Sequence, residues 1–162
     1  MNKIIPNLWY NKNAEEAVNF YTSIFKNSKI KDKSYYGEAS SKVAEMPKGS
    51  LLSIEFELDG NEFLAINGGP AFKFTEAVSF MIDCKNQEEV DYFWDKLTEG
   101  GEESVCGWLK DKYGLSWQVV PTILNEMLKD KDAERAERVM KAMLDMKKII
   151  ISDLEKAYGG EK

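Results

Sequence analysis

The side chains able to do chemistry in this sequence are carboxylates, amides, hydroxyls and thiols, because none of its 162 residues is a histidine. Histidine is the usual general base near neutral pH and the commonest metal ligand. Its absence excludes Ser-His-Asp and Cys-His catalysis and the metal sites that are built on imidazole. Any acid–base chemistry must therefore use Glu, Asp, Lys, Tyr or Cys.

Two carboxylates, Glu55 and Glu57, alternate with apolar residues along a predicted strand over residues 51–58. Side chains of a strand point alternately to its two faces, so Ser53 shares a face with both carboxylates while the apolar residues face the core. A partly buried glutamate is able to act as a general acid or base. Glu55, the more central of the pair, is the candidate catalytic residue; the alternative is that both carboxylates only face water.

The same alternation in two later predicted strands, residues 77–84 and 115–120, puts further polar residues on the corresponding face. We expect these strands to line a concave surface that holds a small organic ligand. For its amide and aromatic members, a hydrogen bond within the sheet or simple packing is the alternative. The candidate ligand-binding residues are Ser53, Glu57, Phe63, Asn67, Ser79, Trp108, Tyr113, Ser116 and Gln118.

The two cysteines, Cys84 and Cys106, are too far apart in the sequence for a CxxC redox or zinc motif. A cysteine outside such a motif usually behaves as a small apolar residue of the core. We therefore expect both to be buried, reduced and structural, and a functional Cys106 is the alternative.

The composition, with 43% hydrophobic and 31% charged residues, is that of a soluble globular protein. A net charge of -6 and the scattering of Lys among Asp and Glu argue against nucleic-acid binding, which needs a basic surface. No apolar run reaches the ~18 residues that a membrane helix needs. The N-terminus lacks the apolar stretch of a signal peptide, so we expect a cytoplasmic protein without nucleic-acid or membrane partners.

A helix-start pattern occurs twice, from Asn13 and from Asn86, each with a Glu three residues later, as in a capping box. Aromatic and aliphatic residues follow at helical spacing, a β-favouring run precedes each helix, and further runs follow it. This repetition predicts a βαβββ unit written twice, with one strand of the second copy short or missing. Residues 39–49 are predicted to be a loop. The predicted strands cover residues 4–10, 30–36, 51–58, 62–67, 77–84, 103–109 and 115–120.

The chain after Pro121 has a helical pattern. A short helix is predicted over residues 122–128, and Asp132 is positioned to cap a longer amphipathic helix. Residues 149–151 favour an extended conformation, and Ser152 opens a second predicted capping box. We therefore divide the chain into a paired βαβββ domain, residues 1–121, and a helical extension, residues 122–162, packed on the same domain.

Four segments together resemble the PhnB-like family of the vicinal-oxygen-chelate, or glyoxalase, superfamily: Asn13 to Tyr21, Asn67 to Pro70, Gly107 to Gln118, and the tail from Val139 to Tyr158. Members often carry the label 3-demethylubiquinone-9 3-methyltransferase. The resemblance implies an α+β fold in which paired βαβββ modules form a curved mixed sheet around a concave site. It also implies a homodimer, sometimes with exchanged modules.

The resemblance further places four metal-ligand positions of the superfamily near Pro6, Ala65, Ala77 and Gln118. The first three cannot bind a metal through a side chain, and a lone glutamine is a weak ligand. We therefore expect no metal and no cofactor. The sequence also lacks the glycine-rich nucleotide loop, followed by an acidic residue on the next strand, that would support S-adenosylmethionine binding.

The function expected from these observations is the metal-independent binding of a small organic molecule whose identity the sequence does not give. One alternative is a metal-independent enzyme of lyase or isomerase type that uses Glu55 for proton transfer. A second alternative is a protein interaction module built around the C-terminal helices.

Overall fold

The fold is described from a computed structural model, over residues 3–160 of the chain. The chain forms two compact units, one up to Lys73 and one from Phe74 onward, and each contains its own four-stranded sheet. The division of the chain into a domain of residues 1–121 and an extension stays a prediction.

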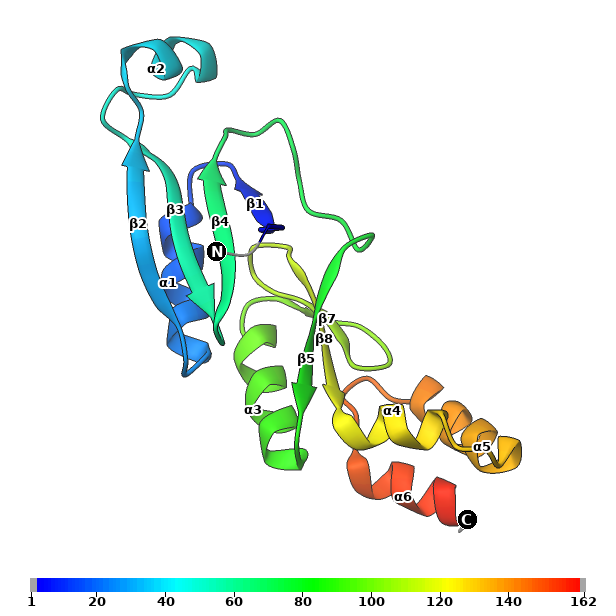
Figure 1. Ribbon diagram of the computed structural model, residues 1–162. Coiled ribbons are helices and arrows are strands. Elements are labelled where there is room, and N and C mark those ends of the chain that lie inside the picture. Colours follow the sequence, from blue (N-terminus) through cyan, green and yellow to red (C-terminus); the bar gives the residue numbers. More distant parts are fainter. Residues whose placement is uncertain (1–2, 161–162) are drawn as a thin grey trace. The chain divides into compact units, whose positions relative to one another are not determined.

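The first unit has a mixed sheet whose strands lie in the order β1-β4-β3-β2 (Figure 1). β1 runs parallel to β4, while β3 pairs antiparallel with both β4 and β2. α1 packs against β3 and β4. The elements are β1 (Asn7–Tyr10), α1 (Ala14–Ile24), β2 (Lys29–Tyr35), α2 (Glu38–Ala44), β3 (Leu51–Leu58) and β4 (Asn61–Asn67).

The second unit repeats this plan and adds helices at its end. Its sheet has the order β5-β8-β7-β6, with β5 parallel to β8 and the other pairs antiparallel. α3 packs against this sheet. The elements are β5 (Ser79–Cys84), α3 (Gln87–Thr98), β6 (Glu102–Glu103), β7 (Trp108–Lys110), β8 (Ser116–Pro121), α4 (Thr122–Leu128), α5 (Ala133–Leu144) and α6 (Ile151–Gly159).

The identical strand order of the two sheets confirms the predicted fold class, α+β with two βαβββ units and a helical extension. The expected weakness of the second copy is also present. Its predicted strand over residues 103–109 is split into β6, of two residues, and β7, of three. The four residues between them form the connecting turn, with Cys106 in a left-handed conformation.

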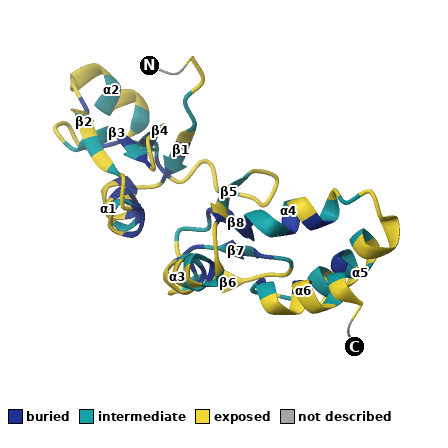
Figure 2. Cartoon of the chain, turned by 60° about the horizontal axis from the view of Figure 1, so that its bottom comes forward, coloured by how far each residue is buried: buried dark blue, intermediate teal, exposed yellow. Residues whose placement is uncertain are grey.

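Each long helix buries one side of its sheet. Ile54 and Phe56 of β3 are fully buried against α1, as the alternation predicted, and Val119 of β8 is fully buried on the α3 side. Figure 2 shows buried residues on α1, α3 and the strands. We call the side of each sheet opposite α1 or α3 its open face.

The two predicted helix caps have different outcomes. Asn86 caps α3 as expected, because its Oδ1 accepts a hydrogen bond from Glu89 N at 2.9 Å. Asn13 is the N-cap residue of α1, as predicted, but its side chain makes no cap bond, so the predicted capping box was wrong there. Instead Ala14 N, at the start of α1, donates to Oδ1 of Asn67 at the end of β4, 2.9 Å away. A residue distant in sequence thus replaces the local cap.

The predicted loop over residues 39–49 was wrong in its first half, where the structure has the helix α2. Gly37 N donates to Oγ of Ser40 at 3.0 Å, which fixes the first turn, and Lys42 pairs with Glu38 at 3.2 Å. α2 has no buried residue and therefore no apolar stripe (Figure 2). Hydrophobic periodicity, the main signal for a helix, is absent from this segment.

The C-terminal helices share a hydrophobic cluster. Asp132 caps α5 as predicted, accepting from Glu134 N at 3.0 Å. The predicted capping box at Ser152 was wrong, since α6 begins at Ile151 and its N-cap residue, Ile150, makes no side-chain cap bond. The cluster is built from β8, three helices and the connection before α6. Its buried members are Val120, Leu124, Met127, Val139, Ile149 and Leu154.

The segment before α6 is tied to the rest of the second unit by backbone and side-chain bonds. Cys106 N donates to Met146 O, and Gly107 N to Lys147 O, both at 2.8 Å. Gln87, in the first turn of α3, donates from Nε2 to Ile149 O at 3.1 Å and accepts from Ile151 N at 2.8 Å. One side chain therefore satisfies two backbone groups next to the start of α6.

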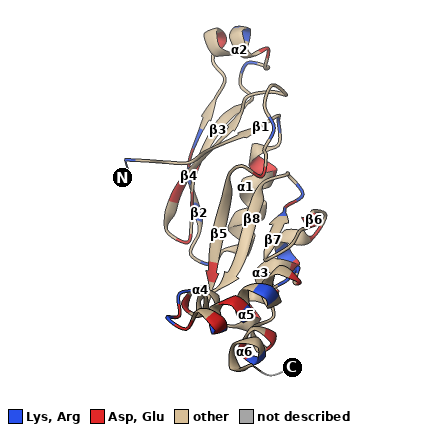
Figure 3. Ribbon diagram, turned by 90° about the vertical axis from the view of Figure 1, so that its right-hand side faces the viewer, with Lys and Arg blue, Asp and Glu red and all other residues tan. Residues whose placement is uncertain are grey.

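Acidic and basic residues are interspersed on the helices of the second unit (Figure 3). Lys148 pairs with Asp91 of α3 at 3.0 Å, and Lys141 pairs with Glu137 within α5 at 3.7 Å. This agrees with the mixed surface charge inferred from the sequence. No helix in the described part of the chain has the length and hydrophobicity to cross a membrane.

Replacing Gln87 with Ala should loosen the C-terminal helices, because it leaves Ile149 O and Ile151 N without their partner. We expect a loss of about 1–3 kcal/mol in the free energy of unfolding and faster hydrogen exchange at the Ile151 amide. Glu88→Gln, one residue later and exposed, is the control and should change neither. Unchanged exchange at Ile151 in Gln87→Ala would show that the extension is held by its apolar cluster alone.

Candidate functional site

The open face of the first sheet carries the residues expected from β3. Ser53, Glu55 and Glu57 lie opposite the buried Ile54 and Phe56, as the strand alternation predicted. The antiparallel hairpin continues this face onto β4, where Leu64 and Ile66 are the cross-strand partners of Glu55 and Ser53. The face therefore combines carboxylates with hydrocarbon.

Glu57 is held by lysines of β2, 3.1 Å from Lys29 Nζ and 3.3 Å from Lys31 Nζ. The hydrogen bond from Lys29, followed by that from Lys31, holds the pKa of Glu57 below its ordinary value. Glu55 is exposed, and none of the described residues forms a hydrogen bond or ion pair with it. Its cross-strand partner on β2 is Asp32, a like charge. Glu57 is thus a charge-paired residue, while Glu55 is available for a ligand.

Phe63 and Asn67, expected near the open face, lie on the opposite, helix-covered side of β4. Phe63 is 8% exposed and stacks on Phe56 with ring centroids 5.4 Å apart. Asn67 is 4% exposed and caps α1. Its Nδ2 also donates to Leu51 O at 3.2 Å, and its backbone carbonyl accepts from the Tyr36 hydroxyl at 2.6 Å. The structure therefore engages both residues in packing and capping.

Trp9 adds an aromatic surface to the open face at β1, where its cross-strand partner is Ile66. The indole Nε1 donates to Gly69 O at 2.9 Å, and Phe72 meets the ring edge-on at 5.0 Å. A Cβ at Gly68 would lie 2.1 Å from the indole, so the ring position requires glycine there. Trp9 was not among the candidate residues, although the Gly-Gly pair that seats it was in the sequence.

The open face of the second sheet holds Ser79, Gln118 and Trp108 on neighbouring strands. Gln118 lies between Met81 of β5 and Trp108 of β7 in the strand register. Its Nε2 donates to Ser79 Oγ at 2.9 Å. Ser116 is 1% exposed, and its Oγ has no hydrogen-bond partner among the described residues. These residues share one face, as predicted.

Tyr113 belongs to the turn between β7 and β8, which a buried carboxylate organises. Asp111 is 2% exposed and accepts from Tyr113 N at 2.8 Å, Leu115 N at 3.1 Å and Trp117 Nε1 at 2.9 Å. The Lys112 ammonium lies 5.3 Å from the centre of the Tyr113 ring. The sequence analysis did not assign this role to Asp111. The signal for it was present, since an Asp before a Lys-Tyr-Gly turn often accepts hydrogen bonds from the backbone of that turn.

The metal-ligand positions that the resemblance implies do not form a ligand set. Ala65 is fully buried on the helix-covered side, and its neighbours toward the open face, Leu64 and Ile66, have hydrocarbon side chains. In residues 3–160, no three Cys, Asp or Glu side chains come together in a group that could hold a metal ion. The side chains present therefore do not fit a metal at the expected place.

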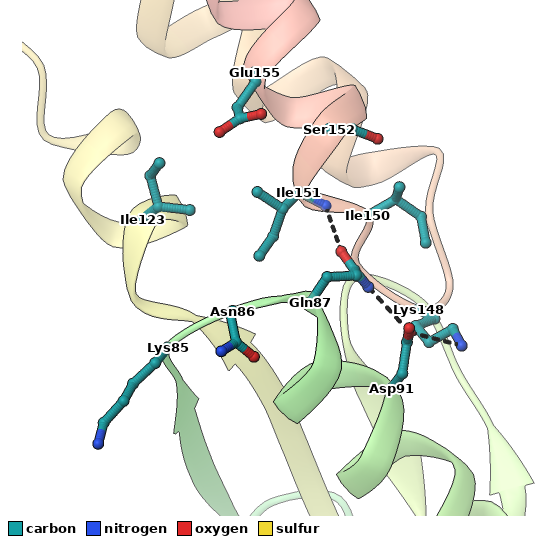
Figure 4. A pocket seen from close by; sticks show the side chains of 10 residues that line it. All are labelled: Lys85, Asn86, Gln87, Asp91, Ile123, Lys148, Ile150, Ile151, Ser152 and Glu155. Atoms are coloured by element: carbon teal, nitrogen blue, oxygen red, sulfur yellow. Dashed lines mark hydrogen bonds and ion pairs between the residues drawn. The ribbon is translucent and has the colours of Figure 1, made fainter.

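A cavity of about 600 Å³ lies between the starts of α3, α4 and α6 (Figure 4). Ile123 and Ile151 form apolar walls, Glu155 points into the space between them, and Lys85 points away from it (Figure 4). Gln87 crosses its floor and is engaged with the backbone of the extension. The cavity therefore lies where the C-terminal helices contact α3.

The two thiols differ in their surroundings. Cys84 is fully buried, and burial, together with the carboxylates of Glu89 and Asp83, raises the pKa of its thiol to about 12. Cys106 is half-buried and has a positive φ of 57°. The expectation of a buried structural thiol is confirmed for Cys84 but not for Cys106.

The first three quarters of the chain carry a family signature. A family model described as 3-demethylubiquinone-9 3-methyltransferase matches residues 2–120. The chain belongs to this family. The 3-demethylubiquinone-9 3-methyltransferase family match ends one residue before the end of β8, so the helical extension lies outside it.

Solved structures agree with this membership. The PhnB protein of Bacillus cereus, also described as a 3-demethylubiquinone-9 3-methyltransferase, is 35% identical over 75% of this chain and 100% of its own, with a TM-score of 0.66. Protein PA1353 of Pseudomonas aeruginosa is 18% identical over 75% and 98%, with a TM-score of 0.60. The fosfomycin resistance protein FosX of Listeria monocytogenes is 19% identical over 80% and 98%, with a TM-score of 0.53. The fold is that of the vicinal-oxygen-chelate proteins. Comparison with curated proteins gives no match.

Replacing Gly68 with Ala should destabilise the first unit, because the added methyl overlaps the Trp9 indole. Overpacking of this kind costs about 1–3 kcal/mol, and thermal unfolding followed by tryptophan fluorescence measures it. Gly159→Ala is the control, since nothing lies within 4 Å of a Cβ there; its melting temperature should stay the same or rise. Equal melting of Gly68→Ala and the parent would contradict the packing role of Gly68.

Cys84 should not react with iodoacetamide at pH 8 in the folded protein, because only the thiolate is the nucleophile. A Cys106→Ser variant isolates its signal, and mass spectrometry should detect labelling only after unfolding. The unfolded thiol ionises near its ordinary value of 9.0 and the folded one near 12, so stability should fall as the pH rises between these values. Rapid labelling of native Cys84 at pH 8 would contradict its burial.

Proposed function

We propose that this protein binds a small organic molecule on the open face of its second sheet. The main support for this proposal is that Ser79, Gln118 and Trp108 form a row on neighbouring strands. Small-molecule sites combine apolar and aromatic surface with a few fixed polar groups. This row has both kinds of group, because Trp108 lies beside Gln118 in the register of β7 and β8.

The orientation of Gln118 supports this assignment. Its Nε2 is occupied by Ser79 Oγ at 2.9 Å, which fixes the rotation of the amide. No described residue donates to its Oε1, so this oxygen is open to a hydrogen-bond donor of a ligand. A polar group whose position is set before binding loses little entropy when the ligand arrives. The alternative given for Gln118, a hydrogen bond within the sheet, is present and serves this orientation.

We infer that ligand binding does not use a metal. FosX of Listeria monocytogenes has been solved with Mn(II) and a sulfate ion, but at 18% identity it shares only the fold with this chain. Here Pro6, Ala65 and Ala77 offer no ligand atoms from their side chains. A metal bound by Gln118 alone would be held weakly, since strong sites combine several ligands of matched geometry.

An enzymatic role for Glu55 is the second candidate, and one observation favours it. Glu55 is exposed on the open face of the first sheet, and no cation of residues 3–160 pairs with it, whereas Glu57 beside it is held by Lys29 and Lys31. A carboxylate without a fixed partner is free to exchange a proton with a ligand. The homodimer, the cytoplasmic location and an interaction role of the C-terminal helices stay predictions.

Native mass spectrometry of the purified protein is the first step of the test, because a retained adduct identifies the ligand class. Titration of that compound should then show an affinity that Gln118→Ala weakens by about 3–10-fold, the value of one hydrogen bond. Glu55→Gln should leave this affinity unchanged and serves as the control. Equal affinity of Gln118→Ala and the parent would place the ligand elsewhere, and turnover that Glu55→Gln abolishes would make the protein an enzyme.

A further inference from the structure

A small pocket lies where the open face of the second sheet meets α4. It has a volume of about 280 Å³ and belongs entirely to the second unit. Two of its residues come from β5, three from α4, and one, Lys129, is the residue that follows α4. The lining residues are Met81, Asp83, Thr122, Asn125, Glu126 and Lys129.

The pocket is continuous with the row around Gln118. Met81 is the cross-strand partner of Gln118 and remains 56% exposed. Ser79, Met81 and Asp83 alternate along β5 and therefore point to the same face. An apolar side chain thus connects the amide of Gln118 with the polar pocket, and one ligand of modest size is able to contact both.

The helix α4 presents its polar side to the pocket. Thr122, Asn125, Glu126 and Lys129 follow the spacing of one helical face. Leu124 and Met127, on the other side, are buried in the cluster of the C-terminal helices. This burial fixes the rotation of α4, so the direction of its polar face is set by the core.

A hydrogen bond joins the two walls of the pocket. The Thr122 hydroxyl donates to Asp83 Oδ1 at 3.0 Å, and the same hydroxyl lies 3.2 Å from Cys84 O. The start of α4 is thereby attached to the end of β5. This hydrogen bond holds the two walls together, and a pre-organised site loses less entropy on binding.

The remaining polar groups of the pocket are the Asn125 amide and two side chains of opposite charge, Glu126 and Lys129. Among the residues that the structure describes, none forms a hydrogen bond or ion pair with the side chains of Asn125, Glu126 or Lys129. Glu126 and Lys129 stand three residues apart on one helix, a spacing at which such pairs often meet, yet they are separate here. The pocket thus offers a cation, an amide and two carboxylates, counting Asp83.

We propose that this α4 pocket is a subsite for a zwitterionic group, with an ammonium and a carboxylate on one small molecule. The ammonium lies against the carboxylates of Asp83 and Glu126, and the carboxylate lies against the Lys129 ammonium and the Asn125 amide. The subsite rests on the proposed function, since it receives one end of the ligand held at Gln118. Its residues from Thr122 onward lie beyond the family match to residues 2–120, whereas Met81 and Asp83 lie within it.

Titration of the full-length protein with L-alanine, followed by amide resonances in NMR spectra, tests the subsite. We expect saturable shifts confined to residues 81–83 and 122–129, and binding of acetate and of methylammonium at least tenfold weaker. Lys129→Met and Glu126→Gln should each raise the Kd for L-alanine at least fivefold. Lys96→Met, an exposed lysine of α3 outside the pocket, should leave it unchanged.

Two results would overturn the subsite: no saturable shift at these residues, or a Kd that Lys129→Met and Glu126→Gln leave unchanged. Circular dichroism of both variants checks that they fold, and their exposed positions make a large loss of stability unexpected. Gln118→Ala separates the two proposals. A ligand whose affinity depends on Gln118 but not on Lys129 retains the proposed function and eliminates the subsite.

Discussion

A single helix of eleven or twelve residues covers only one face of a four-stranded sheet, and this constraint shapes both units. α1 and α3 each bury one side, where Phe56 and Val119 are inaccessible to water. The opposite side of each sheet is left to polar residues, to ligands or to other parts of the protein. The candidate residues Glu55, Gln118 and Ser79 lie on that second side, as the alternation of side chains along their strands requires.

The segments that resemble the family prove to be mainly architectural. Asn67 caps α1 from the end of β4, Gly68 makes room for the Trp9 indole, and Asp111 gathers the turn between β7 and β8. Asn67 and Asp111 accept hydrogen bonds from groups that would otherwise be unpaired, and Gly68 allows the close approach of an aromatic ring. These roles concern the fold of the chain and carry no information about a ligand. This explains how the family could be identified from the sequence while the ligand could not.

The sequence predicted the structure best in the strands, where side chains alternate between the two faces of the sheet with a period of two residues. β3 was predicted residue for residue, and its open face followed from alternation. Phe63 and Asn67 were misplaced because the hairpin register, set by the two left-handed residues Asp59 and Gly60, pairs Phe56 with Phe63 on the covered side. The cap of α1 was missed for a related reason, since it comes from a residue that only the folded sheet brings near. α2 left no hydrophobic pattern to find.

The helical extension is the part of the chain in which function has room to differ from that of relatives. The family model ends at residue 120, so α4 to α6 lie outside the part of the chain that defines the family. The extension nevertheless belongs to the second unit, because its apolar cluster includes Val120 of β8 and its backbone is bound by Gln87 of α3. Since α4 follows β8 without a linker, its polar face stays close to the end of β5. A ligand held by the row of Ser79, Gln118 and Trp108 would therefore take its further contacts from α4.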